Sequence, residues 1–526
     1  MTTSTCSRFL LAAVLILAVC SGSQYSAVAQ GTAYDGYTLF NPNNSRTTYL
    51  VDMQGNTVHQ WNHARNGGYS VYLLENGHLL RPAVTSTPAI RGAASAGLIQ
   101  EIDWDGNVVW EFDYAGSDHV THHDIEPMPN GNILMIAWEV KSSTEAAAAG
   151  RVNARTMWPD HLVEVKPEGT NGGTIVWEWH AWDHLVQDRD PSAANYGIVS
   201  EHPELIDINL GGVSGGPGSG DWLHINGISY NPVNDQIVIS SHFMDEIYVI
   251  DHSTTKEEAA GHAGGQYGKG GDLLYRWGKP QNYGAPGSEV FDVVHCSYWV
   301  PEGLPGEGNI MAFNNNERTR ASTIVEISPP VDGEGRYILQ SGQAYGPTAP
   351  HWSYSNGSVF YSNHLGGNQR LPNGNTLITE ATSGYLFEVD PQGNEVWNFS
   401  FGQQIARSLR YGRDYPGLAA LLGTDVGTNP ALASTITISC APNPLTDFTV
   451  FNYSTHSAND LRITIHDMLG KQLRVLHLGD HAPGNYQATW DGRDYAGNRV
   501  APGMYVYSLI STTENRVSGK VLVTSR

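Results

Sequence analysis

Apolar and polar residues alternate along most of this chain in short runs separated by Asn-Gly or Gly-Asn pairs. The clearest unit is HLGGNQRLPNGNTLITEATSGYLFEVDPQGNEVWNF, from His364 to Phe399. Alternation bounded by such pairs predicts strands joined by tight turns, and this unit contains four strands. The expected element is therefore an antiparallel four-stranded sheet.

The same unit recurs along the chain with loops of variable length. Its turn and apolar strand return in LLENGHLL, PNGNILMI, NPVNDQIVI and GEGNIMAF, and each is followed by a second pair of strands rich in aromatic residues, as in LIQEIDWDGNVVWEF. Four strands per repeat is typical of a β-propeller blade, and the count predicts about six blades. An array of β-sandwiches explains the aromatic fourth strand less well.

The two ends of the repeat region are complementary. GYTLFNPNNSRTTYLVDMQGNTVHQW, near the N-terminus, supplies only the last three strands of a unit. ARSLRYGRDY, after the last complete unit, reads as one additional strand. We therefore expect the late strand to complete the first blade and close the ring.

The pattern changes after TDVGTNPALAST. Alternating strands bounded by Pro, Gly and Asp-Gly signals then continue to the C-terminus. They predict a small immunoglobulin-like β-sandwich over residues 435–526, after a propeller over residues 30–425. The chain is thus expected to be all-β.

The N-terminus has the layout of an export signal. Arg8 precedes an apolar run from Phe9 to Cys20, and Ala27-Val28-Ala29 reads as a cleavage site. The run is short for a transmembrane anchor, and Val19 is bulky for a lipoprotein site at Cys20. We expect a signal peptide over residues 1–29 and a secreted, cell-surface or periplasmic protein.

The composition of the chain limits the classes of partner that the protein is expected to bind. The 526 residues include 52 acidic and 29 basic side chains, a formal net charge of −23. This charge disfavours nucleic acid and anionic membranes as main partners. Two cysteines lie beyond the signal, Cys296 and Cys440, in different predicted domains, so no disulfide framework is expected and Cys296 is interpreted as a small buried residue.

A histidine stands at the head of the first strand in four units. These are His122 or His123, His224, His295 and His364. The first strand of a blade lies nearest the central axis, so the fold should gather these rings at one opening of the channel. A register slip of one residue would instead turn any of them into the sheet packing.

Other polar residues accompany the histidines. They are Asp124, Asp221, Asn226, Asn314, Asn315, Arg318, Arg320, Arg410 and Tyr411. Imidazoles with arginine and amide donors suit a tetrahedral oxyanion better than a metal ion. A zinc or copper site completed by Asp124 and Asp221 is the competing interpretation. No HExxH, CxxC, P-loop or GxSxG motif stands in the context it needs, and we expect no cofactor.

With these residues in view, the region from about 35 to 420 resembles the bacterial arylsulfotransferases. The resemblance rests on DWLHINGISYNPVNDQIVISS with IYVID and YRWGKP, FDVVHCSYWV, MAFNNNERTR and SNHLGGNQRLPNGNTLITEATSGYLFEVD. The last ninety residues or so resemble the immunoglobulin-like terminal modules, related to that of the flagellar hook-capping protein, of proteins exported by type IX secretion. PNP, WDGRD and PGMYVY carry that second resemblance.

The first resemblance implies transfer of a sulfuryl group from a phenolic sulfate ester to a phenol through a sulfohistidine, without a nucleotide sulfate donor. It implies the catalytic residues His364 as nucleophile, His224, His295 and Arg318. The substrate-binding residues expected with them are His123, Asn226, Asn315, Arg320 and His242. His242 stands where the family commonly has arginine, and FNNN replaces the usual FDNG. The partners implied are a phenolic sulfate donor, a phenol and, for the terminal module, the secretion machinery.

Two other functions remain open at this stage. One is a surface-displayed propeller that binds a ligand without turnover. The other is a metal-dependent hydrolase or lyase that uses the same histidines. The sequence does not identify the sulfate ester that acts as donor or the phenol that acts as acceptor.

Overall fold

The computed structural model describes residues 27–29, 33–85, 90–211 and 220–422, and residues 436–524 except 456–457, 467–471, 482–483, 496 and 511–515. The chain forms two compact units, residues 1–422 and 423–526. Most of the expected signal peptide and the segment TDVGTNPALAST lie outside the described residues. Among the helices described, none is long and apolar enough to cross a membrane.

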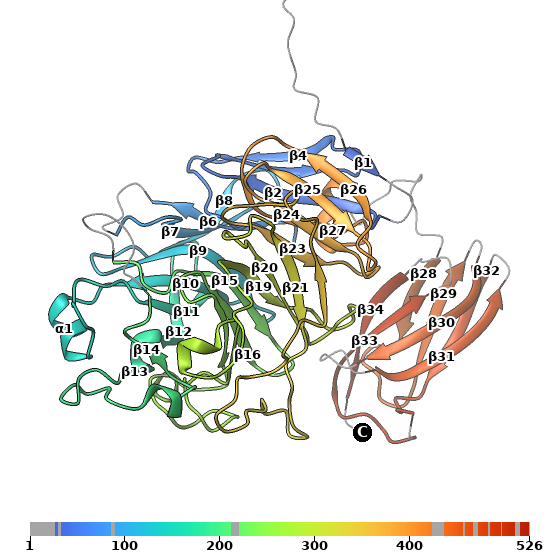
Figure 1. Cartoon of the computed structure of the whole chain (residues 1–526). Coiled ribbons are helices and arrows are strands. Elements are labelled where there is room, and N and C mark those ends of the chain that lie inside the picture. The colour runs from blue at the N-terminus through green and yellow to red at the C-terminus, as the bar shows by residue number, and fades with distance from the viewer. Residues whose placement is uncertain are drawn as a thin grey trace, which may run out of the picture. The chain divides into compact units, whose positions relative to one another are not determined.

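The first unit consists of six antiparallel sheets (Figure 1). Three of them, each given from the innermost strand outward, are β27 (Ile405–Gly412), β2 (Gly36–Pro42), β3 (Thr47–Val51), β4 (Thr57–Asn62); β5 (Tyr72–Leu73), β6 (Leu79–Val84), β7 (Gly97–Ile102), β8 (Val108–Asp113); and β9 (His119–Pro127), β10 (Ile133–Glu139), β11 (Asp160–Pro167), β12 (Gly173–His180). The other three are β15 (Ile225–Asn231), β16 (Gln236–Ser241), β17 (Glu246–Asp251), β18 (Tyr275–Trp277); β19 (Val294–Trp299), β20 (Ile310–Asn314), β21 (Thr323–Ile327), β22 (Trp352–Tyr354); and β23 (Gly367–Arg370), β24 (Thr376–Glu380), β25 (Tyr385–Val389), β26 (Glu395–Ser400), with β1 (Ala27–Ala29) on the outer edge of β26.

The remaining elements lie in the loops. They are α1 (Ser143–Ala148), the parallel pair β13 (Leu185–Val186) and β14 (Ile206–Asp207), α2 (Lys256–Ala259), α3 (Ala419–Leu422) and the short 3-10 turns Ala181–Asp183, Val199–Glu201, Pro280–Tyr283 and Pro416–Leu418.

These sheets confirm the predicted all-β propeller and the way its ring closes. Strand β27, from the end of the unit, pairs with β2 from its start, with Tyr37 opposite Tyr411 and Leu39 opposite Leu409. Figure 1 accordingly shows the orange β27 among the blue strands. The first blade therefore takes its innermost strand from the far end of the sequence.

The Asn-Gly signals form the expected turns. Between β9 and β10, Gly131 has φ +83°, a conformation that glycine adopts without the strain of a Cβ atom. The Asn130 side-chain oxygen accepts a hydrogen bond of 2.9 Å from the Asn132 amide. Such Asx turns fix the hairpin geometry and with it the register of the strands.

Tryptophans of the outer strands connect the blades around the whole ring. Each indole N–H donates to a main-chain carbonyl of the following blade, at distances of 2.7–3.2 Å. The pairs are Trp61 to Asp103, Trp110 to Gly172, Trp179 to Gly271, Trp277 to Pro347, Trp352 to Pro391 and Trp397 to Met53. The aromatic ends of the repeats therefore have a structural role, and the last pair joins the sixth blade to the first.

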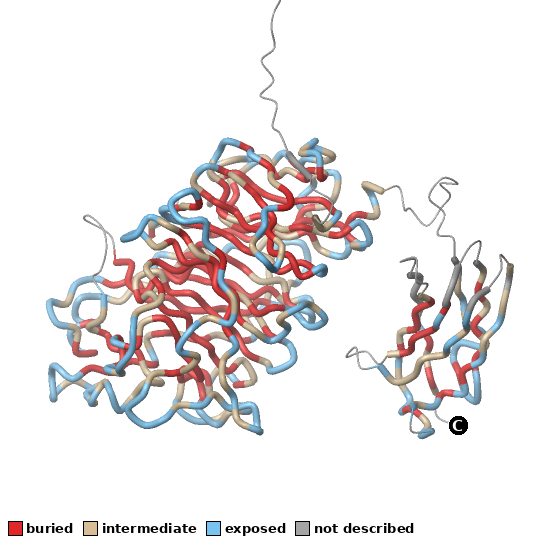
Figure 2. Tube along the Cα trace, turned by 45° about the vertical axis from the view of Figure 1, so that its right-hand side comes forward, coloured by how far each residue is buried: buried red, intermediate tan, exposed pale blue. Residues whose placement is uncertain are grey.

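The second unit is the expected small sandwich. One sheet holds β28 (Ile436–Ala441), β29 (Thr449–Thr455) and β32 (Gly484–Trp490), and the other holds β31 (Gln472–His481), β30 (Ala458–His466), β33 (Gly503–Ile510) and β34 (Arg516–Val523). Phe451 and Trp490 from one sheet share a core with Ile463 and Leu509 from the other. In both units the buried segments lie inside and the exposed ones at the loops (Figure 2).

Candidate functional site

Four histidine rings lie in series, three of them on or directly before innermost strands and the fourth after β16. His123 lies in β9, His224 directly precedes β15, and His295 is the second residue of β19. His242 follows β16, and its ring lies between those of His224 and His295. The ring centroids are 4.4 Å apart for His123 and His224, 4.8 Å for His224 and His242, and 5.3 Å for His242 and His295. Residues from three blades therefore meet at one end of the channel.

The backbone is distorted where it presents these side chains. His123 and His224 both have φ +53°, and Cys296 has φ +48°. The pairing registers with the neighbouring strands shift between Thr121 and Ile125 in β9, between Ile225 and Gly227 in β15, and between His295 and Tyr298 in β19. Such bulges re-aim side chains, and residues with side chains enter the left-handed region at some energetic cost. Two of the histidines therefore lie at backbone positions that depart from regular strand geometry.

Of the two adjacent histidines, His123 faces the cluster. The ring of His122 stacks on Trp138 at 3.8 Å, and its Nε2 lies 3.1 Å from Asp160 Oδ1. The two Nδ1 atoms of the pair are 2.7 Å apart. His122 therefore belongs to the packing of its blade and supports His123 from behind.

His295 and Asn315 hold the segment that carries His364. The Asn315 amide donates to the carbonyls of Ser362 (2.9 Å) and Leu365 (2.7 Å), so its Oδ1 accepts from His295 Nδ1 (2.6 Å). That hydrogen bond leaves His295 Nε2 as the acceptor for the Leu365 N–H, at 3.3 Å. Asn315 and His295 therefore position the backbone next to His364.

His364 itself is exposed at the mouth of the channel. Asn43 donates to Gln404 Oε1 (2.8 Å), which orients the Gln404 amide so that its Nε2 donates to His364 Nε2 (2.6 Å). The other ring nitrogen, Nδ1, lies 2.6 Å from Asn363 Oδ1 and donates to it. This chain of hydrogen bonds places the lone pair of His364 on Nε2.

The buried rings stay neutral at ordinary pH. Burial, followed by the neighbouring histidines, lowers the pKa of His242 to about 2. Burial also lowers the pKa of His295 to about 3, and that of His123 falls well below its ordinary value for the same reason. The Nδ1 of His224 is hydrogen-bonded to the Asp221 carboxylate.

The central arginine is Arg407 of β27, which the sequence reasoning missed. Its guanidinium donates to Asp124 Oδ2 (2.9 Å) and to the Tyr72 hydroxyl. Arg410 and Tyr411, named from the same strand, lie elsewhere: Arg410 is buried against Glu388 and Thr38, and the Tyr411 hydroxyl accepts from the Leu73 amide. Arg407 and Arg410 differ by an odd number of positions, so they point to opposite faces of the strand.

The two arginines expected from the Asn-rich loop are not brought to the histidines. Arg318 is 62% exposed and pairs with Glu289 and Asp292 at 3.0 Å each. The Arg320 guanidinium lies 5.8 Å from the Tyr361 ring. Asn226, in contrast, is buried between β15 and β19, where it donates to the Val294 carbonyl (2.7 Å) and accepts from Ser240 (2.7 Å).

Two cavities share this channel. The smaller one, about 30 Å³, is lined by His123, His295, Asn226, Cys296 and Arg407, and its volume suits a water molecule. The larger one, about 350 Å³, shares only Cys296 and Arg407 with the first. Burial raises the pKa of the Cys296 thiol, which disfavours its thiolate form.

One candidate metal-binding group occurs in the described part of the chain, and it lies outside these cavities. It consists of His184, His262 and Asp272. Both histidines place Nδ1 within 2.9 Å of Asp272 Oδ1, and His184 Nε2 also lies 2.9 Å from the Ala259 carbonyl. The three groups are thus already hydrogen-bonded to one another.

Comparison with known proteins gives two family matches. The model of the arylsulfotransferase (ASST) family matches residues 24–411, and that of the FlgD Ig-like domain matches residues 446–515. No curated protein matches the chain.

Solved structures resemble parts of the chain at low identity. A protein of unknown function from Bacteroides caccae has a TM-score of 0.39 at 11% identity, covering 72% of this chain and 98% of its own. The periplasmic gluconolactonase PpgL of Pseudomonas aeruginosa has a TM-score of 0.34 at 11% identity, covering 86% and 99%. FlgD of P. aeruginosa has a TM-score of 0.13 at 19% identity, covering 17% and 65%.

Proposed function

Because the chain belongs to the arylsulfotransferase family, whose model spans residues 24–411, we propose that it transfers a sulfuryl group from a phenolic sulfate ester to a phenol through a sulfohistidine. Membership of the family supports aryl sulfotransferase activity in general. The observation that carries the finer proposal is an exposed histidine, His364, whose Nε2 lone pair is fixed by hydrogen bonds next to a series of buried histidines.

In the first half of the reaction, His364 Nε2 attacks the sulfur of the aryl sulfate. The N–S bond forms, the bond between sulfur and the aryl oxygen breaks, and its electron pair leaves with the phenolate. Gln404 must release Nε2 for this attack, while Asn363 keeps the proton on Nδ1. His364 fits the role because the cavity around the buried rings is too small for a sulfate ester.

His224 is placed to move the proton. Its Nδ1 is held by Asp221, so the ring, when protonated on both nitrogens beside that carboxylate, gives its Nε2 proton to the departing phenolate and regains one from the acceptor phenol. In the second half, the acceptor oxygen attacks sulfur, the N–S bond breaks, and His364 regains its lone pair. Neither half of the reaction requires a nucleotide sulfate donor.

N–H donors near the transferred group are the second requirement. Arg407 lines the same small cavity as His295, and its Nε has no hydrogen-bond partner among the described residues. His242 lies between His224 and His295. We assign both to stabilising the sulfuryl oxygens as charge develops on them.

Transfer from a chromogenic aryl sulfate to phenol by the purified protein tests this proposal. The assay contains a chelator and compares wild type, His364→Asn and, as a matched control, His351→Asn, which removes an exposed histidine outside the cluster. We expect wild type and His351→Asn to form product and His364→Asn to lose it. Product formation by His364→Asn at the wild-type rate contradicts the assigned nucleophile, and no product from wild type with any aryl sulfate contradicts the function.

We further propose that the protein is exported and that its second unit serves secretion or surface attachment by the type IX route. The FlgD Ig-like match supports an immunoglobulin-like terminal module. Expression of the full chain and of a form ending at residue 422 in a type IX-competent host, with each cell fraction assayed, tests this role. Equal export of the two forms contradicts it.

A further inference from the structure

The larger cavity lies at the opposite end of the channel from the histidines. The innermost strands supply its lining from their carboxyl-terminal halves, including Glu126 of β9, Tyr230 of β15 and Trp299 of β19. In the same strands His123 precedes Glu126 in β9, and His224 and His295 lie at the amino-terminal ends of β15 and β19. At about 350 Å³, this cavity falls within the range of sites for small organic molecules.

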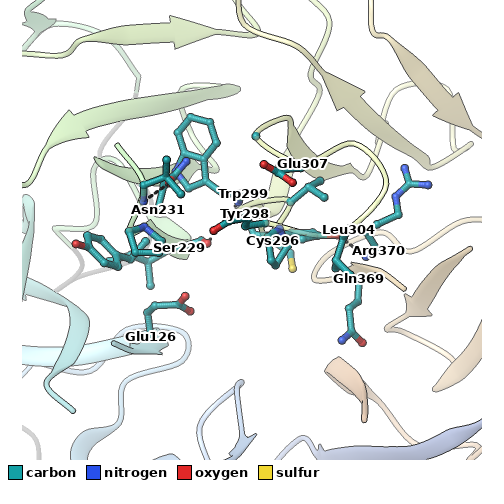
Figure 3. Close-up of a pocket in the computed structure, with 18 of the residues that line it drawn as sticks. Glu126, Ser229, Asn231, Cys296, Tyr298, Trp299, Leu304, Glu307, Gln369 and Arg370 are labelled. Carbon is teal, nitrogen blue, oxygen red and sulfur yellow. Dashed lines mark hydrogen bonds between the residues drawn. The ribbon is translucent and has the colours of Figure 1, made fainter. Parts of the chain in front are cut away.

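Its walls combine aromatic rings with a few polar groups. Tyr230, Trp299 and the loop residue Leu304 form apolar surface, while Glu126, Tyr72 and Arg407 are polar. Figure 3 shows the Glu126 carboxyl group turned toward the open centre of the cavity. Apolar walls with a small number of fixed polar groups are typical of sites that orient an aromatic ligand.

The polar groups form one hydrogen-bonded network, and the phenol group of the Tyr72 side chain is part of it. The Tyr72 hydroxyl lies 3.5 Å from Glu126 Oε2 and 3.3 Å from Asp124 Oδ1, and it accepts from Arg407. Each of these carboxyl groups accepts a hydrogen bond from a phenolic O–H. The chemistry that binds the side chain of Tyr72 therefore also suits the hydroxyl of a phenolic ligand.

Charge argues against an anionic occupant. The Arg407 charge is matched by Asp124 at 2.9 Å, and the Arg370 charge by Glu326 at 2.5 Å. Glu302 and Glu307 are exposed at the rim. These carboxylates would repel a sulfate ester, and no unpaired cation is present among the described lining residues to offset that repulsion. A neutral phenol carries no charge for the carboxylates to repel.

We propose that this cavity is a separate binding site for an uncharged phenol, whose ring packs against Trp299 and Leu304 and whose hydroxyl donates to Glu126. The inference goes beyond sulfuryl transfer, because binding here requires no histidine and no turnover. Burial, with Asp124 as the second cause, raises the pKa of Glu126 to about 8, so its carboxyl is largely protonated at neutral pH. A neutral carboxyl further favours a neutral ligand.

Titration calorimetry of the full chain with 4-ethylphenol tests the site without relying on catalysis. Leu304→Trp fills the cavity from a partly exposed loop, and Ile338→Trp is the matched control because Ile338 is exposed and outside the cavity. We expect binding to one site in wild type, Ile338→Trp and His224→Asn, and at least tenfold weaker binding in Leu304→Trp. Equal melting temperatures of the two tryptophan variants establish that the fold is retained.

A second comparison tests the hydroxyl contact. Wild type should bind 4-ethylphenol about tenfold more tightly than 4-ethylanisole, in which the hydroxyl is methylated, and Glu126→Leu should abolish that difference. The proposal is overturned if no binding occurs, if binding is lost in His224→Asn but kept in Leu304→Trp, or if 2-phenylethylamine or 4-ethylphenyl sulfate binds the cavity more tightly than the phenol. Failure of sulfuryl transfer would leave these binding results unaffected.

Discussion

Replacing His295 by glutamine should reduce the acid sensitivity of the propeller. His295 is buried, and its pKa falls from an ordinary 6.5 to about 3 in the folded protein. The pKa of His295 is lower in the folded protein than in the unfolded chain. Its contribution to the free energy of unfolding is therefore fully present above pH 6.5 and is lost as the pH falls from 6.5 toward 3. In that interval the unfolded chain binds a proton that the folded chain does not.

The magnitude follows from the two pKa values. At pH 5.0, 1.5 units below the ordinary value, protonation of the unfolded state costs folding about 2 kcal/mol, at about 1.4 kcal/mol per unit. Wild type should therefore lose about 2 kcal/mol more of its unfolding free energy than His295→Gln when the pH is lowered from 7.5 to 5.0. Other buried histidines contribute to the loss in both proteins.

Denaturant unfolding followed by tryptophan fluorescence measures this difference. Thirteen of the fourteen tryptophans precede residue 423, so the signal reports mainly on the propeller. Asn315→Ala is the control, because it removes the partner of His295 without removing a titratable group, and its loss of stability should be equal at both pH values. If His295→Gln loses as much unfolding free energy as wild type between pH 7.5 and 5.0, His295 is not a source of the acid sensitivity.

Three further predictions concern other parts of the propeller. Arg276 and Glu246 form a fully buried ion pair at 2.5 Å, so Arg276→Met should lower the unfolding free energy by roughly 3–5 kcal/mol, and adding Glu246→Leu should restore part of it in the same denaturation assay. Trp397→Phe removes the hydrogen bond to Met53 that joins the last blade to the first, and should cost about 1 kcal/mol by the same measurement. Asn363→Ala removes the acceptor that fixes the proton on His364 Nδ1, and should lower kcat about tenfold with little change in KM in the sulfate-transfer assay. Equal stability after either core change, or a change in KM alone, would contradict the corresponding argument.

The fold was predictable because its signals are local and repeated. Tight turns and alternating strands recur in every blade, and the incomplete first unit indicated the closing strand β27. The tryptophans at the ends of the repeats link neighbouring blades. Short-range patterns of this kind remain visible in a single sequence.

The site was predictable only in part, because it depends on orientation within one strand. Histidines from three blades lie in series, yet four of the inner strands have register shifts that a period-two pattern does not reveal. Arg407 was missed because Arg410, on the opposite face of β27, looked equivalent. Arg318 was assigned from its motif, but its loop holds it against two carboxylates.

The most direct test of the proposed mechanism is mass spectrometry of the protein during turnover of an aryl sulfate without added acceptor. The account predicts that wild type gains the mass of one SO₃ group, that peptide mapping locates it on His364, and that added phenol removes it with formation of the new sulfate ester. An adduct on another residue, or steady transfer with no adduct, would contradict the claim that His364 carries the sulfuryl group.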